Sequence, residues 1–108
     1  MSYEVRLTDD ATADLDDLYS YIARYDSLQS AESVLTRIDD AFVSLSRQPH
    51  RGVYPAELSD IGVRDYREIF FKPYRIIYRV VGKIAYVYIV VDGRRDMQTL
   101  LKRRLLAA

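Results

Sequence analysis

Five arginine side chains in the second half of the chain are candidates for binding anionic groups: Arg67, Arg75, Arg79, Arg94 and Arg95. Arg75 and Arg79 belong to a run over 74–81 in which β-branched and aromatic residues predict a strand. Because side chains alternate between the two faces of a strand, both guanidinium groups should project to one side and Ile76 to the other. Guanidinium groups bind phosphate and carboxylate oxygens strongly. This face could therefore meet phosphates or an acidic protein.

Each of these arginines also has an ordinary structural explanation. Arg75 and Arg79 could form the solvent-facing row that one-sided antiparallel sheets usually show. Arg94 and Arg95 could belong to a charged turn that leads into a helix, and Arg67 could be half of an edge-strand pair. The residues alone leave both interpretations open.

Two further sets of polar residues could do chemistry but have simpler explanations. Asp14, Asp16 and Asp17 could form a metal or acid/base site, but they lie off the apolar stripe of their helix, and we expect them to be solvated. His50 could act as a general base. No serine or cysteine nucleophile stands in a recognisable motif, so we expect His50 at the surface of a loop.

The composition excludes several classes of site. The sequence has no cysteine and a single histidine, which excludes disulfides, thiolate chemistry and a plausible zinc ligand set, so we expect no metal and no cofactor. The longest apolar run, 84–91, is far shorter than the roughly 18 residues that suggest a membrane span. The N-terminus shows no signal-peptide core. We expect a soluble, cytoplasmic protein without membrane contact.

The net charge of zero hides an asymmetry between the two halves. Residues 1–63 hold 5 basic and 12 acidic residues, a balance of −7, whereas residues 64–108 hold 11 basic and 4 acidic residues, a balance of +7. If the halves occupy different sides of the molecule, the protein has one cationic surface.

Two amphipathic helices are predicted in the first half. Thr8 followed by two aspartates indicates a helix start, and apolar residues then recur at spacings of three and four as far as Tyr25. A second helix is predicted from about residue 30 to Arg47, and Pro49 ends it. A short connection between two apolar stripes predicts an antiparallel helical hairpin.

The second half is predicted to be a meander of three antiparallel strands, over 66–71, 74–81 and 84–91. Residues 3–7 alternate enough for a short strand, 49–62 is a connecting segment, and Asp96 can cap a final helix over 97–106. The length supports a single domain, 1–108. The predicted fold is α+β, in the order β-α-α-β-β-β-α. The hairpin covers one face of an antiparallel sheet and leaves the arginine-bearing face bare.

Motifs along nearly the whole chain carry a resemblance to a known family. They are, in order, Ala13-Asp14-Leu15 with Leu18 and Tyr21-Ile22; Leu45, Pro49 and Gly52; Gly62 with Tyr66-Arg67; Tyr74 to Val80; and Gly93-Arg94-Arg95-Asp96 with Leu100-Leu101 and Arg104-Leu105. In this order and spacing, the sequence resembles the RelE/ParE superfamily of toxins from bacterial type II toxin–antitoxin modules.

The resemblance implies this fold and one of two growth-inhibiting activities. RelE-like members are ribosome-dependent ribonucleases that cut mRNA, whereas ParE-like members inhibit DNA gyrase and occur in modules linked to plasmid stabilisation. Both kinds are neutralised by a small cognate antitoxin, ParD-like in the second case. Operator DNA is expected to be bound only through that antitoxin.

The resemblance also suggests which residues bind the target. Arg75 aligns with the family's arginine in the middle strand, and Arg94 or Arg95 with its arginine after the last strand. In a ribonuclease, Arg75 and Arg95 would stabilise the phosphorane charge. Where RelE-like enzymes carry a tyrosine or histidine near the start of the final helix, this sequence has Met97 and Leu100, which cannot transfer a proton. An inhibitor of gyrase is therefore favoured over an enzyme; the ribonuclease and an inactive antitoxin-binding relative remain alternatives.

The tyrosines suggest a surface for the antitoxin. The chain has ten tyrosines and no tryptophan, which suits a surface that is amphipathic without being strongly apolar. Tyr19, Tyr21 and Tyr25 lie on the first helix, and we expect them to contribute to an antitoxin groove. The alternative is that they only seal the edges of the core.

Overall fold

The computed structural model describes residues 2–106 of the chain. The elements are, in order, β1 (Glu4–Leu7), α1 (Asp9–Tyr25), α2 (Leu28–Arg47), α3 (Ala56–Ser59), β2 (Arg67–Phe71), β3 (Tyr74–Val81), β4 (Ile84–Asp92), α4 (Met97–Leu101) and a π-helical turn, η1 (Lys102–Leu106). None of the helices in this described part is long and apolar enough to span a membrane. The α+β fold that the sequence predicts is confirmed, with one added short helix, α3.

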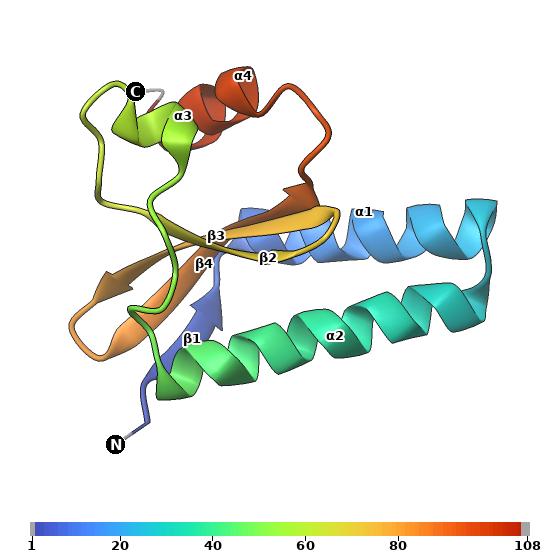
Figure 1. Cartoon of the computed structure of the whole chain (residues 1–108). Coiled ribbons are helices and arrows are strands. Elements are labelled where there is room, and N and C mark those ends of the chain that lie inside the picture. The colour runs from blue at the N-terminus through green and yellow to red at the C-terminus, as the bar shows by residue number, and fades with distance from the viewer. Residues whose placement is uncertain (1, 107–108) are drawn as a thin grey trace.

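The four strands form one sheet in the order β1-β4-β3-β2 (Figure 1). β2, β3 and β4 make the antiparallel meander that the sequence predicts. β1 pairs in parallel with β4, so the complete sheet is mixed. The sequence did not predict the parallel pair, because the hairpin, β2 and β3 separate β1 from β4 along the chain and no local pattern encodes such a contact.

α1 and α2 form the predicted antiparallel hairpin, which covers one face of the sheet (Figure 1). The Thr8 side chain accepts a hydrogen bond from the Ala11 backbone N–H at 3.1 Å, and Ser27 caps α2 through the Ser30 N–H at 3.0 Å. The apolar stripes pack on the sheet in a first core of Ala11, Ile38, Leu45, Ile69, Ile76, Tyr78, Ala85, Val87 and Val90. Burial of this apolar area is the main force that holds the hairpin on the sheet.

The opposite face of the sheet is also covered, so the expectation of a bare arginine-bearing face is wrong. α3 and α4 lie over it (Figure 1) and close a second core of Leu58, Tyr66, Ile77, Ile89, Val91, Met97, Leu100 and Leu101. Ile77 does share a face with Arg75, as the alternation predicts, but this face is apolar enough to require cover. The cover was missed because α3 has only 4 residues, too few to show a helical period.

A β-bulge changes the alternation where β3 pairs with β4. Ile77 pairs with Ile89 and Tyr78 with Val87, so Tyr88 has no partner on β3. Tyr88 and Ile89 both pack on the side of α3 and α4. The aromatic ring of Tyr88 therefore joins the second core.

Buried Tyr78 ties the loop after α2 to the sheet. Its hydroxyl donates a hydrogen bond to the Pro49 carbonyl at 2.6 Å and accepts one from the Gly52 N–H at 3.0 Å. A Cβ atom at Gly52 would lie 2.6 Å from the Tyr78 hydroxyl oxygen. Only glycine allows this close approach of the loop to the sheet.

Candidate functional site

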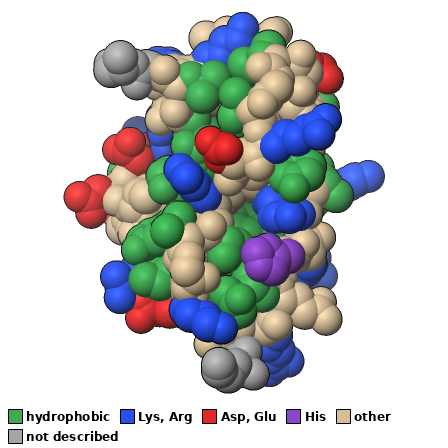
Figure 2. Space-filling view, turned by 90° about the vertical axis from the view of Figure 1, so that its left-hand side faces the viewer, with side chains coloured by type: hydrophobic (Ala, Val, Ile, Leu, Met, Phe, Trp, Pro, Cys, Tyr) green, Lys and Arg blue, Asp and Glu red, His purple; other side chains and the backbone are tan. Residues whose placement is uncertain are grey.

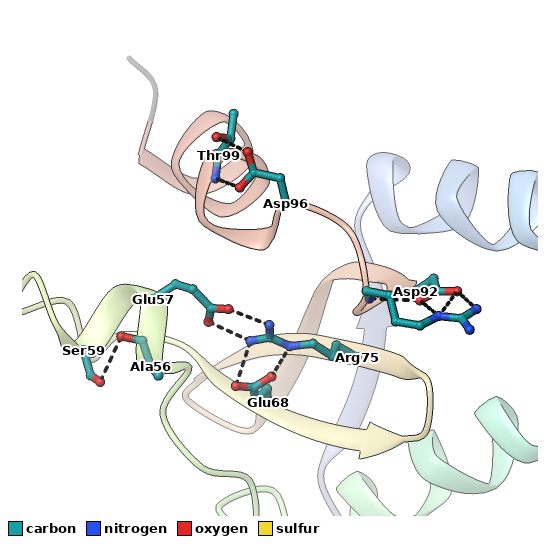
Figure 3. Close-up of polar contacts among 9 residues, drawn as sticks. Ala56, Glu57, Ser59, Glu68, Arg75, Asp92, Asp96 and Thr99 are labelled. Carbon is teal, nitrogen blue, oxygen red and sulfur yellow. Dashed lines mark hydrogen bonds and ion pairs between the residues drawn. The ribbon is translucent and has the colours of Figure 1, made fainter.

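Arg75 lies between two glutamates on the face that α3 covers (Figure 3). Its Nε donates to Glu68 Oε1 at 2.6 Å and its Nη2 to Glu68 Oε2 at 3.0 Å. Its Nη1 and Nη2 also donate to the two carboxylate oxygens of Glu57, at 2.7 and 2.8 Å. Glu68 comes from β2 and Glu57 from α3, so one guanidinium joins three elements through two bidentate pairs.

This cluster is shielded from solvent and internally neutralised. The Arg75 side chain is 11% exposed and that of Glu68 is 4% exposed. The hydrogen bond from Arg75 lowers the pKa of Glu57, whereas burial raises the pKa of Glu68 against the opposing effect of Arg75. The hydrogen bond to Glu57 raises the pKa of Arg75, which therefore stays charged. With two carboxylates around one guanidinium, the cluster offers no positive charge to an incoming phosphate.

Arg94 and Arg95 follow Gly93, which lies against the aliphatic part of the Arg75 side chain, and both face solvent. A Cβ atom at Gly93 would lie 2.6 Å from Arg75 Cδ, so the turn must carry a glycine there. Arg94 pairs with Asp92 at 2.5 Å, lowers the pKa of that carboxyl and keeps a 78% exposed side chain. Arg95 is exposed and forms no ion pair with any residue in 2–106.

The other two predicted site arginines have different surroundings. Arg79 is exposed further along β3 and pairs with no carboxylate within the described part of the chain. Arg67 instead donates to the backbone carbonyls of His50 and Gly52, at 3.3 and 2.9 Å, and lies 4.8 Å from the centroid of the Tyr54 ring. Arg67 therefore holds the loop after α2, where His50 is exposed as expected.

A groove of about 530 Å³ runs between α1 and the ends of β3 and β4. Its lining includes Leu18, Tyr21, Ile22, Tyr74, Val90 and Arg95. Tyr21 is 63% exposed there, and its ring lies 4.8 Å from that of Tyr25, which is 70% exposed. Tyr19 is half-buried against α2 instead. The groove thus combines apolar residues with a charged margin of Asp14, Asp17, Asp92, Arg94 and Arg95, and the exposed ring of Tyr25 lies next to the Tyr21 ring that lines it.

The Asp14 side chain is largely shielded, with 14% exposed, and connects three elements, so the expectation of a solvated side chain is wrong for this residue. Its Oδ2 accepts the Val90 backbone N–H at 3.1 Å, and its two oxygens accept the Arg104 guanidinium at 3.1 and 3.0 Å. Arg104 also donates to the Tyr88 carbonyl at 2.8 Å. The spacing of Asp14, three residues after Ala11 on the apolar stripe, was the signal for this position.

The sequence also did not single out Glu57 and Glu68, the two partners of Arg75. Glu68 lies within an apolar strand, which hints at a buried partner, but Glu57 lies in a loop segment with no pattern. Within residues 2–106, no group of three or more histidine, cysteine, aspartate or glutamate side chains is arranged to hold a metal ion.

Residues 5–97 match the family described as the ParE toxin of the type II toxin–antitoxin system, parDE. The chain belongs to this family. The chain is similar to Toxin ParE3 of Caulobacter vibrioides. The two are 26% identical over 93 residues, which cover 86% of this chain and 89% of that protein. The ParE-family match confirms the superfamily that the motifs predict, and the chain is a toxin of a type II toxin–antitoxin system.

Solved structures share the fold of this ParE-family chain. The chromosomal ParDE system from P. aeruginosa superposes with a TM-score of 0.70 at 20% identity, over 84% of this chain and 96% of that one. The RelBE2 toxin–antitoxin complex from Mycobacterium tuberculosis gives a TM-score of 0.60 at 24% identity, over 85% and 99%. A mutant of the E. coli toxin RelE in the free state gives 0.60 at 18% identity, over 97% and 100%. At these identities the likeness shows the fold alone.

Proposed function

We propose that this ParE-family toxin inhibits DNA gyrase and is neutralised by a ParD-like antitoxin. The observation that carries the proposal is the enclosure of Arg75 by Glu57 and Glu68. A ribonuclease would need this guanidinium at the developing phosphorane charge, and here both of its edges are occupied by carboxylates. The family match, which is to the ParE branch by name, supports the same conclusion.

The start of α4 also favours inhibition over RNA cleavage. Met97, Leu100 and Leu101 are buried in the second core, and none of them can transfer a proton. Asp96 accepts hydrogen bonds from the backbone N–H and the hydroxyl of Thr99, so it caps the helix. RNA cleavage remains the second candidate because Arg95 is exposed and free of carboxylates within residues 2–106. Arg75 would first have to leave its two glutamates.

We assign contact with the target to the exposed arginines. Arg94 and Arg95 follow the last strand and reach solvent, and Arg79 does so from β3. Arg75 and Arg67 act indirectly, because the first positions the turn through Gly93 and the second holds the loop after α2. The five arginines therefore fall into two groups, three that contact the target and two that support the contact residues from within the fold.

We assign the antitoxin to the groove beside α1. An amphipathic helix or extended segment could insert apolar side chains between Leu18 and Val90 and meet the exposed rings of Tyr21 and Tyr25. Tyr19 faces α2 and is not part of this surface. The named partners of two similar structures, ParD in one and RelB in the other, support a proteinaceous antitoxin.

The gyrase proposal is tested by a supercoiling assay with purified gyrase and relaxed plasmid. We expect the wild-type chain to block supercoiling, and the double variant Arg94→Glu/Arg95→Glu to lose most of this effect. Arg24→Glu/Arg37→Glu reverses the same number of charges on the helical hairpin, and this matched control should inhibit like the wild type. Unchanged supercoiling at a stoichiometric excess of toxin would reject gyrase as the target.

The two alternatives give distinct results in cells. A ribosome-dependent ribonuclease would produce new codon-positioned mRNA ends in primer extension, and these ends would disappear in Arg95→Ala. An inactive relative would bind antitoxin tightly and leave growth unaffected on induction. Normal transcripts together with growth arrest would favour gyrase over both.

The antitoxin groove is tested by binding measurements with the purified cognate antitoxin. Tyr21→Ala and Tyr25→Ala should each weaken the complex by about ten-fold, because each removes a large exposed ring from the interface. Tyr19→Phe, which keeps its packing against α2, is the control and should bind normally. Equal affinity for all three variants would place the antitoxin elsewhere.

A further inference from the structure

Side chains from four separate segments form a continuous row at one end of the molecule. Lys83 Nζ lies 5.1 Å from the centroid of the Tyr3 ring, and the Tyr3 ring meets the His50 ring edge-on at 6.2 Å. Arg67 reaches the His50 carbonyl at 3.3 Å and lies 4.8 Å from the centroid of the Tyr54 ring. Two cations and three rings therefore lie along this cation–ring row, in the order Lys83, Tyr3, His50, Arg67 and Tyr54.

The row carries positive charge that neighbouring carboxylates do not neutralise. The loop 48–55 contains Arg51 and no acidic residue. Glu4 and Glu68, the acidic residues next to the row in the sequence, each pair with an arginine outside it. Figure 2 shows this face, on which the chain's single histidine, in purple, lies among Lys and Arg side chains. The Asp and Glu side chains on the same face lie away from the histidine (Figure 2), so this part of the face attracts a polyanion.

Two rings of the row, those of His50 and Tyr54, are exposed as well. Tyr54 is 42% exposed and the adjacent Val53 is 56% exposed, so an apolar surface lies beside the cations. A ring that a guanidinium already holds on one side is fixed in orientation and can receive a second planar group without losing much freedom. Fixed rings between cations are the arrangement with which proteins stack successive bases while binding the connecting phosphates.

We infer that the cation–ring row binds single-stranded nucleic acid. Lys83, Arg51 and Arg67 contact successive phosphates, and an unpaired base stacks on Tyr54. An acidic peptide would use the cations but would leave the ring without a matching group. A duplex would keep its bases stacked inside the helix. This inference goes beyond the action on gyrase and does not rest on it, because it concerns the free toxin and a free oligonucleotide.

Binding is measured by the fluorescence anisotropy of a labelled oligothymidylate of about 15 nucleotides. For three phosphate contacts, raising the salt from about 50 to about 200 mM should weaken binding by about ten-fold or more. A labelled duplex of the same length and an acidic peptide are measured in parallel, and both should bind at least ten-fold more weakly. No binding at the lower salt, or equal or tighter binding of either competitor, overturns the inference.

The charges of the row are tested by the double variant Arg51→Ala/Lys83→Ala. Both side chains are exposed and form no ion pair within residues 2–106, so the variant should fold normally. The slope of log K against log salt should fall by about 0.7 for each cation removed. Arg24→Ala/Arg37→Ala removes the same charge from the hairpin and should leave the slope unchanged. An equal effect of both double variants means attraction by net charge alone and overturns the site.

The ring is tested by comparing Tyr54→Ala with Tyr54→Phe. Stacking predicts about a ten-fold loss of affinity for the alanine variant and near-normal binding for the phenylalanine variant. Circular dichroism checks that both variants keep the wild-type fold. Loss of binding in both, or in neither, removes Tyr54 from the site. The supercoiling assay is independent of these measurements, so either proposal can fail alone.

Discussion

Arg75 and Arg51 show two opposite ways in which this toxin uses an arginine. Arg75 is almost buried, and two carboxylates occupy its guanidinium. Arg51 is exposed in a loop without acidic residues. The strand pattern that drew attention to Arg75 reports the face on which a side chain lies, but not what lies above that face. A cation in the covered part of a strand can thus connect elements, as Arg75 does, whereas exposed cations such as Arg51 and Arg79 remain available to partners.

The largest effect is expected from Arg75→Ala. It leaves Glu68 buried without its counter-charge, and such a loss should cost about 3–5 kcal/mol of unfolding free energy. Arg51→Ala should cost less than about 0.5 kcal/mol because its side chain is exposed. Urea denaturation of both variants measures the difference. Similar unfolding free energies for the two variants would mean that the ion pairs of Arg75 do not stabilise the fold.

Asp14→Ala tests the partly buried ion pair with Arg104, and we expect the unfolding free energy to fall by about 2–3 kcal/mol. The change leaves Arg104 and the Val90 N–H without an acceptor in a partly buried position. Asp14→Asn keeps an acceptor oxygen and should lose less. Asp16→Ala, on the exposed side of α1, is the control and should stay within about 0.5 kcal/mol of the wild type. Equal losses at Asp14 and Asp16 would contradict the anchoring role.

Tyr78→Phe tests how much the uncharged hydrogen bonds of the Tyr78 hydroxyl contribute to the unfolding free energy. It removes one hydroxyl that bonds both Pro49 and Gly52, so we expect a loss of about 1–2 kcal/mol. Hydrogen exchange should also speed up at the Gly52 amide, which loses its acceptor. Exchange at the wild-type rate would show that the loop holds its position without Tyr78.

The smallest effect is expected from Glu57→Gln, which should change how the unfolding free energy depends on pH in the acid range. Arg75 holds the pKa of Glu57 below its ordinary value of 4.5, so the stability from this carboxylate is fully present above that pH and is lost as the pH falls through the lowered value. Glu57→Gln should therefore show a shallower loss below about pH 4.5 in urea denaturation. Glu68, whose pKa burial raises, acts in the opposite sense and is present in both proteins. Parallel acid limbs would contradict the pairing.

Local sequence signals were sufficient for most of the fold. The hairpin, the three-stranded meander and the caps at Thr8 and Asp96 depend on spacings and residue types within one element, so the sequence predicts them well. The parallel pairing of β1 depends on a contact between distant segments. α3 offers no period at all. Tertiary pairing of short elements was therefore the limit of prediction.

The site was less predictable than the fold for the same reason. Arg75 was identified, but its partners Glu57 and Glu68 come from a loop helix and a neighbouring strand whose register the sequence does not show. The separation of charge in space is smaller than the sequence suggests. Glu57 of the acidic half pairs with Arg75 of the basic half, and Asp14 pairs with Arg104 in the same way. Charges that look unbalanced along a chain can be balanced in space.

The contact between Asp14 and Arg104 has a consequence for biosynthesis. Translation adds Arg104 to the chain 90 positions after Asp14. A nascent chain can therefore assemble its hairpin while the carboxylate still lacks its cation. A truncated product that ends before the final helix lacks this cation and should be less stable than the full chain. Cellular proteases should therefore degrade the truncated toxin faster than the complete one.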